Sequence, residues 1–295
     1  MTKRAPQIVA ALAVAGLIVA VCLRGSRIPS RGDGEARLRI VSLAPSVTEM
    51  LFVLGVEDCM VGRTDRCDYP PAARRIRSVG GFGTPSVETL LALSPDLVIA
   101  TGLERPEATE ALRRAGIRIL WIKTGCFEDL FDAFRKIGRE VGAAARAEQV
   151  VARMQAQLKA VGAGYRDVPR EQRPRVFVEV WNDPLTTVGS ASFVDELVER
   201  AGGVNVAHGV AEAYPTINPE KVVEWNPEVI VLSYMSQQQA SAALAKRIGW
   251  DRIRAVRSGR IISDIPSDLL LRPGPRLVDG VRALNQELYA NRDAS

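Results

Sequence analysis

Two segments of this chain repeat one pattern at a separation of 132 residues. The first reads VETLLALSPDLVIA around Glu88, and the second reads PEKVVEWNPEVIVL around Glu220. In each, the glutamate opens an amphipathic helix, a proline follows seven residues later, and an acidic residue precedes four apolar residues suited to a strand. Solenoid repeats recur every ~20–50 residues, so this spacing is too long for a solenoid. It predicts two lobes of similar construction facing each other across a cleft, which is typical of binding proteins.

Short apolar strands alternate with helices through most of the chain. In the first half, the pattern predicts strands at 39–43, 60–62, 97–100 and 117–122, and helices at 48–54, after Glu88 and at 106–115. After a polar break, it predicts strands at 176–180, 229–232 and 261–262, and helices at 193–201, 222–225 and 276–289. This alternation indicates an α/β fold with mainly parallel sheets. We expect the strand order 2-1-3-4 in the first sheet.

Two long helical stretches lie between the halves, at 127–141 and 143–161. The second contains neither glycine nor proline and is rich in strong helix formers, so it predicts a rigid spacer. We therefore expect four parts. Residues 1–36 form a signal or anchor segment with a linker, 37–142 an N-terminal α/β lobe, 143–163 a connecting helix, and 164–295 a C-terminal α/β lobe.

The N-terminal part resembles a targeting segment, because Lys3 and Arg4 precede an apolar run of 16 residues at 8–23. That length lies between a signal core and a membrane span of about 20 residues. No A-x-A cleavage site follows, and Val21 is bulkier than the small residue preferred before a lipidated cysteine such as Cys22. We expect a periplasmic or extracytoplasmic protein, either freed from this segment or tethered by it. A buried apolar helix is the alternative.

Composition and motifs argue against nucleic-acid binding and against most enzymes. The net charge of +5 comes from dispersed arginines rather than a basic stripe. The sequence lacks G-x-S-x-G, H-E-x-x-H and the glycine-rich phosphate motifs. Its one histidine, His208, is expected to be solvated, with axial ligation of a bound metal as the alternative. A hydrolase based on Asp65 and Asp68 stays open as an alternative function, as does a tethered sensor domain.

Four cysteines leave an odd number once Cys22 is assigned to the N-terminal segment. Cys67 and Cys126 both follow predicted strands, so an exported protein could join them by a disulfide; free thiols are the alternative. Cys59 is placed at the opposite edge of the sheet. No C-x-x-C motif is present, and we expect no metal site.

An ordered set of motifs resembles a known family. The set lies between residues 39 and 289 and comprises RIVSLAPSVTEMLFVLG, VGRTDRCDYPP, both repeated segments, AGGVN and LRPGPRLVDGVRALN. These motifs are similar to those of the periplasmic substrate-binding proteins of cobalamin and iron-chelate ABC importers. The vitamin B12-binding proteins are the most similar members. The resemblance implies two α/β lobes joined by one rigid helix, no enzymatic activity and no cofactor. It also implies a corrinoid ligand between the lobes, with haem or a ferric siderophore as the alternative, and an ABC permease dimer as partner.

The resemblance also implies roles for particular residues. Glu88 and Glu220 match the glutamates that meet permease arginines, although an acidic residue in a first helical turn is already favoured by about 0.3–1 kcal/mol. Trp121, Trp225 and Trp250 are expected in the core, and Leu269, Leu270 and Leu271 stand where relatives often carry aromatics. The implied ligand-binding residues are Arg66, Tyr69, Phe82, Trp181, Tyr214 and Arg272.

Overall fold

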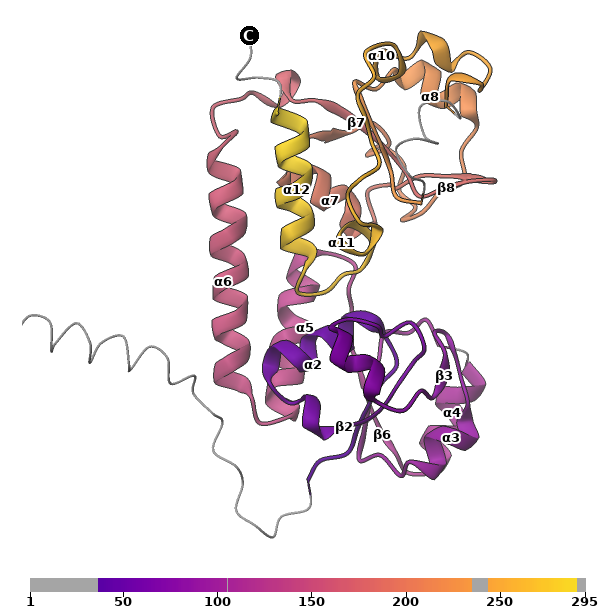
Figure 1. Cartoon of the computed structure of the whole chain (residues 1–295), viewed down its shortest axis with the longest axis vertical. Coiled ribbons are helices and arrows are strands. Elements are labelled where there is room, and N and C mark those ends of the chain that lie inside the picture. Colours follow the sequence, from indigo (N-terminus) through magenta and orange to yellow (C-terminus); the bar gives the residue numbers. More distant parts are fainter. Residues whose placement is uncertain (1–36, 105, 235–243, 291–295) are drawn as a thin grey trace, which may run out of the picture. The chain divides into compact units, whose positions relative to one another are not determined.

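The computed structural model describes residues 37–104, 106–234 and 244–290, and Leu38–Ser295 form one compact unit (Figure 1). The apolar run at 8–23 and Cys22 lie outside the described residues. Within those residues, no helix combines the length and the apolar character that crossing a membrane requires. The proposed boundaries of the lobes and of the targeting segment stay a prediction.

The first sheet contains four parallel strands in the order β2-β1-β5-β6, which confirms the predicted order. Strands β1, β5 and β6 pair in regular register, for example Ile40 with Leu97, whereas the pairing of β1 with β2 shifts between Ile40 and Val41. Helices flank the sheet in the alternating manner of α/β proteins. The elements are β1 (Ile40–Ser42), α2 (Pro45–Leu54), η1 (Glu57–Cys59), β2 (Met60–Arg63), η2 (Pro71–Arg75), α3 (Val87–Ala92), β5 (Leu97–Ala100), α4 (Pro106–Arg114) and β6 (Arg118–Trp121).

The second sheet is built in the same way, with parallel strands in the order β10-β7-β11-β12. In each sheet, the second strand along the chain, β2 or β10, lies at the edge of the sheet next to the first strand, β1 or β7. The elements are η3 (Arg170–Gln172), β7 (Arg175–Glu179), α7 (Phe193–Arg200), β10 (Val204–Asn205), α8 (Pro219–Trp225), β11 (Val229–Leu232), η4 (Trp250–Arg252), α10 (Arg254–Arg257), β12 (Ile261–Ile262), α11 (Ser267–Leu271) and α12 (Leu277–Tyr289).

The repeated segments occupy equivalent positions in the two sheets. Helix α3 leads into β5 and helix α8 leads into β11, and each of these strands is third in its sheet. All four residues of both strands are buried, as expected for parallel strands covered on both faces. The sequence repeat therefore reflects a repeated element of structure.

Two long helices, α5 (Phe127–Glu140) and α6 (Ala144–Ala163), connect the two sheets along the chain. Helix α6 packs against α2 and α5 of the first half and against α7 and α12 of the second. Its buried residues recur at helical spacing and form one apolar stripe. They are Ala147, Val150, Val151, Met154 and Leu158. With 20 residues, α6 is about 30 Å long, which suits it to the spacer role predicted from the sequence.

Two short antiparallel hairpins were not predicted: β3 (Gly80–Gly81) with β4 (Thr84–Pro85), and β8 (Trp181–Asn182) with β9 (Leu185–Thr186). Strands of two residues are too short to carry a periodic pattern.

The core assignment of the tryptophans is correct for Trp250, which is fully buried, but wrong for Trp121, which is 47% exposed. Trp121 ends the edge strand β6, where one side of the strand has no neighbour.

Candidate functional site

Four aromatic side chains are exposed after the carboxyl ends of strands, the edge at which open parallel sheets bind ligands. Tyr69 follows β2, and Phe82 lies in the turn of the β3–β4 hairpin. Trp181 follows β7, and Tyr214 follows β10. Their exposed fractions are 43%, 38%, 53% and 45%, so none of them belongs to the core. Both halves of the chain thus contribute aromatic surface that can contact a ligand.

Hydrogen bonds hold the loop of the first half that carries Tyr69. The backbone amide of Asp65 donates to the Gly80 carbonyl at 2.9 Å, and the Asp65 carboxylate accepts from the Phe82 amide at 3.2 Å. The Arg63 guanidinium donates to four backbone carbonyls, those of Thr64, Asp65, Ala73 and Arg74. The loop and the hairpin that presents Phe82 are therefore tied together.

In the second half, a buried carboxylate supports Trp181. Glu179, at the end of β7, is fully buried and accepts two hydrogen bonds from Arg247, both at 2.7 Å. The Tyr234 hydroxyl also donates to Glu179, and its ring packs against Trp181 with centroids 5.6 Å apart. Burial and the Glu179 carboxylate raise the pKa of Tyr234 above its ordinary value. Sequence analysis missed Glu179; its signal was an acid within the apolar run VFVEV.

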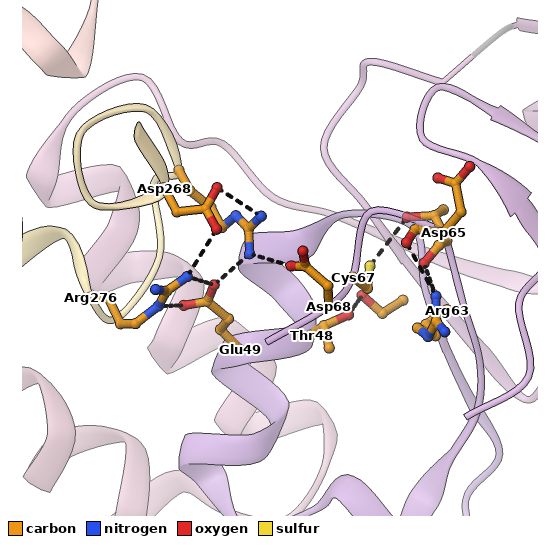
Figure 2. Close-up of polar contacts among 11 residues, drawn as sticks. Thr48, Glu49, Arg63, Asp65, Cys67, Asp68, Asp268 and Arg276 are labelled. Carbon is orange, nitrogen blue, oxygen red and sulfur yellow. Dashed lines mark hydrogen bonds and ion pairs between the residues drawn. The ribbon is translucent and has the colours of Figure 1, made fainter. Parts of the chain in front are cut away.

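A network of ion pairs joins the first half to the second (Figure 2). Glu49 in α2 is 2% exposed and accepts hydrogen bonds from Arg272 at 3.0 Å and from Arg276 at 2.7 and 2.9 Å. Arg272 also contacts Asp68 at 3.1 Å and Asp268 at 3.0 Å. Glu49, which the sequence analysis missed, is thus the shared acceptor of two arginines more than 200 positions away.

This network reaches the aromatic surface through Arg276. Its guanidinium lies over the Tyr69 ring, 3.8 Å from the centroid, which is a close cation–π contact. The ligand role predicted for Arg272 stays a prediction, and in the structure its guanidinium binds three carboxylates. Arg66, by contrast, is exposed on the loop after β2. A positive charge is therefore accessible close to Tyr69 in sequence.

Glu88 and Glu220 occupy matching positions, each the second residue of its helix. The side chain of Ser86 caps α3 by accepting from the Thr89 amide, and that of Asn218 caps α8 by accepting from the Glu220 amide. Both glutamates are exposed, and no ion pair is found for either among the described residues. Their role in docking stays a prediction.

The disulfide considered between Cys67 and Cys126 is not formed, and both cysteines are free. They follow β2 and β6, the outermost strands of the sheet. Three strand spacings of ~4.8 Å separate these strands by about 14 Å, whereas a disulfide needs Cα atoms within about 7 Å. Cys67 is buried with its sulfur 3.1 Å from the Thr64 hydroxyl, and Cys126 caps α5.

The sequence predicted a solvated His208, but in the structure its imidazole also contacts another side chain. Its Nδ1 lies 2.9 Å from the Asp195 carboxylate, although the ring is 54% exposed. Asp195 and Asn205 form the buried part of this cluster. Within the described residues, no group of three or more histidine, cysteine or acidic side chains could hold a metal ion.

A separate hollow of about 370 Å³ lies beside α5 and α6. Its lining includes Phe131, Leu158 and Tyr165, together with the charged side chains of Lys159 and Arg200. None of the site residues predicted from the sequence lines it. Its position on the long helices sets it apart from the strand ends, so we place the candidate site at the four exposed aromatic residues.

Comparison with known proteins matches residues 40–268 to the family described as periplasmic binding protein. An uncharacterized ABC transporter substrate-binding lipoprotein of Bacillus subtilis (strain 168) is 32% identical over 256 residues, which cover 85% of this chain and 80% of the relative. A vitamin B12-binding protein of Vibrio parahaemolyticus (serotype O3:K6) is 27% identical over 245 residues, covering 82% and 86%.

A solved structure supports the same assignment. The crystal structure of a periplasmic heme-binding protein from Pseudomonas aeruginosa is 29% identical, with a TM-score of 0.75, and the match covers 85% of this chain and 92% of that one. The predicted α/β fold with two similar lobes is thereby confirmed. Because the family match spans more than half of the sequence, the chain belongs to the periplasmic binding protein family.

Proposed function

We propose that this chain is the substrate-binding component of an ABC importer. In this role it captures a corrinoid, with cobalamin as the first candidate, outside the cytoplasm and delivers it to a membrane permease. The observation that carries the proposal is the exposed aromatic surface after the strand ends, to which both halves contribute. A flat macrocycle needs wide apolar walls and few polar contacts, and such side chains can supply those walls. Relatives named vitamin B12-binding and cobalamin-binding proteins support the corrinoid.

Haem is the second candidate, favoured by a specific observation. Arg66 adds an exposed cation to the loop after β2, and a guanidinium can pair with the carboxylates of haem. The structural likeness to a heme-binding protein points the same way. Cobalamin has no carboxylate, but its phosphodiester is also an anion that a guanidinium can bind, so Arg66 favours haem and is compatible with cobalamin.

Delivery to a permease is supported by the matched glutamates. A permease with two-fold symmetry would present one basic contact to each lobe, and Glu88 and Glu220 offer one exposed acid at the same helical position in each half. Periplasmic binding proteins are non-enzymatic transport components. A hydrolase that uses Asp65 and Asp68 is therefore not part of this proposal.

Calorimetric titration of the purified chain with cyanocobalamin, cobinamide, haemin and a ferric siderophore tests the ligand. We expect a corrinoid to bind with a micromolar or lower dissociation constant, about −8 kcal/mol. Replacing Trp181 and Tyr214 together by alanine should weaken binding by about tenfold or more, a loss of ~1.4 kcal/mol. Leu91→Ala, an exposed apolar change on α3, is the matched control and should have no effect. Binding of haemin or the siderophore without any corrinoid would contradict the proposed ligand.

A further inference from the structure

A buried carboxylate fixes the imidazole of His208, the only histidine of the chain. The Asp195 side chain is 8% exposed, and its Oδ2 lies 2.9 Å from His208 Nδ1. Because an ionised carboxylate only accepts hydrogen bonds, Nδ1 carries the proton in the neutral ring and Nε2 keeps its lone pair. The lone pair of Nε2 is therefore free to bind a ligand.

The partners of Asp195 are themselves held in place. The Asn205 side-chain amide donates to Asp195 Oδ1 at 2.7 Å and to the Val188 carbonyl at 2.9 Å. The Asn205 carbonyl oxygen accepts from the Ala207 amide at 3.1 Å. The ring is thus oriented by a cluster anchored to the backbone at two places. Histidines that bind metals are commonly oriented by a carboxylate in this way.

This cluster lies at the same edge of the sheet as the aromatic surface of the second half. His208 follows Asn205, the last residue of β10, by three positions. Helix α7 is the crossover between the parallel strands β7 and β10, so its N-terminus lies at the carboxyl ends of those strands. Ser192 caps that helix and lies near the hydroxyl of Tyr214, whose pKa burial raises and Ser192 lowers. His208 and Tyr214 therefore both contact residues at the start of α7.

We propose that His208 supplies, through Nε2, an axial nitrogen ligand to the metal at the centre of the bound macrocycle, either cobalt of a corrinoid or iron of haem. This inference rests on the proposed function, because the macrocycle must first bind. A lone imidazole holds a free ion weakly, whereas a macrocycle already fills four positions around its metal and leaves the axial ones open. Imidazole nitrogen is a common axial ligand of such metals.

The step is a ligand exchange without oxidation or reduction. The Nε2 lone pair forms the bond to the metal, and the water that occupied the axial position leaves with its own electron pair. Macrocycles with an exchangeable axial water should therefore bind more tightly than those with both axial positions filled. Aquacobinamide and haemin have such a position, whereas dicyanocobinamide has none.

Absorbance titration of the full chain with aquacobinamide and with haemin tests the proposal. For wild type, we expect the bands of at least one macrocycle to shift to those of an imidazole complex. The shift should be absent in His208→Ala, with affinity at least tenfold lower, and added imidazole should restore the bands. Asp195→Asn, which disturbs the orientation of the ring, should weaken binding by about 10–100-fold. Binding of dicyanocobinamide should be the same in wild type and His208→Ala.

A second variant separates ligation from folding. His208→Gln keeps a donor for Asp195 but offers no nitrogen lone pair, so it should fold with wild-type thermal stability and still lack the shifted bands. Unchanged spectra and affinity in His208→Ala or His208→Gln, alongside binding by wild type, would overturn the axial ligand alone. Absence of any heat or absorbance change in wild type with all corrinoids and haemin would overturn the proposed function as well.

Discussion

Glu49 is a buried acid whose two partners come from a distant part of the sequence. Its partners Arg272 and Arg276 are 223 and 227 positions away. No local pattern in the sequence connects these residues, because pairing at such a separation is set by the fold. What the sequence does contain is an acid at the start of the apolar run MLFVL, which marks Glu49 as unusual but does not reveal its partners.

Replacing Glu49 should strongly destabilise the protein. Glu49→Ala leaves two mostly buried guanidinium groups without their shared acceptor, and breaking a buried pair in this way costs about 3–5 kcal/mol. Urea unfolding measures the loss. Glu212→Ala removes an exposed acid and should stay within about 0.5 kcal/mol of wild type. Equal stability of the two variants would show that the ion network contributes little.

Tyr234 makes stability depend on pH in the alkaline range. Burial and Glu179 raise the pKa of its hydroxyl, so above about pH 10 the unfolded chain loses a proton that the folded chain keeps. The unfolded state then binds fewer protons, and the free energy of unfolding falls as pH rises. Tyr234→Phe should flatten this fall in urea unfolding between about pH 9 and pH 11. An unchanged slope would mean that other groups account for the fall.

At the scale of elements, the predictability of each strand follows its burial. Strands β5 and β11 were predicted with the correct ends, because four consecutive buried apolar residues are bounded by Pro-acid pairs. Helix α2 begins at Pro45 rather than at 48, since proline is well suited to the first turn of a helix. The two hairpins were missed because strands of two residues are too short to carry a periodic pattern. Strand β10 is equally short, and it pairs with the distant strand β7. The sequence thus predicted most strands of the two sheets but not the hairpins that present Phe82 and Trp181.

Glycine 280 determines how closely α11 can approach α12. A Cβ at Gly280 would lie 2.0 Å from the Leu269 carbonyl oxygen, so Gly280→Ala must push apart the two helices between which Arg276 lies in the sequence. We expect a loss of about 1–3 kcal/mol in thermal or urea unfolding, despite the better helix propensity of alanine. Gly162→Ala in α6 is the matched control, because its Cβ would only reach the Tyr165 hydroxyl at 4.0 Å. It should stabilise by up to ~1 kcal/mol. The idea fails if both changes stabilise the protein.

For the whole molecule, the repeated architecture explains why more of the fold than of the site could be predicted from the sequence. The two sheets share one strand order, so a pattern recognised in one half supports the assignment of the other. The site depends instead on differences between the halves. The Tyr69 ring contacts the Arg276 guanidinium, whereas the Trp181 ring packs against Tyr234, whose hydroxyl donates to Glu179. These contacts come from different elements in the two halves, and the sequence repeat does not predict them.

The matched glutamates allow the transport proposal to be tested separately from ligand binding. Glu88→Ala with Glu220→Ala removes one exposed acid from each half, so it should strongly reduce uptake in cells that depend on this chain for their corrinoid. Ligand affinity in solution should stay within twofold of wild type, because both side chains lie in the first turns of helices rather than among the exposed aromatics.

Glu107→Ala is the matched control: Glu107 is also an exposed acid in a first helical turn, on α4, and its loss removes the same interaction with the helix dipole. It should leave uptake intact. If the double variant and Glu107→Ala reduced uptake equally, the glutamates would be acting through helix stability alone, and a parallel loss of ligand affinity in the double variant would place them in the ligand site instead.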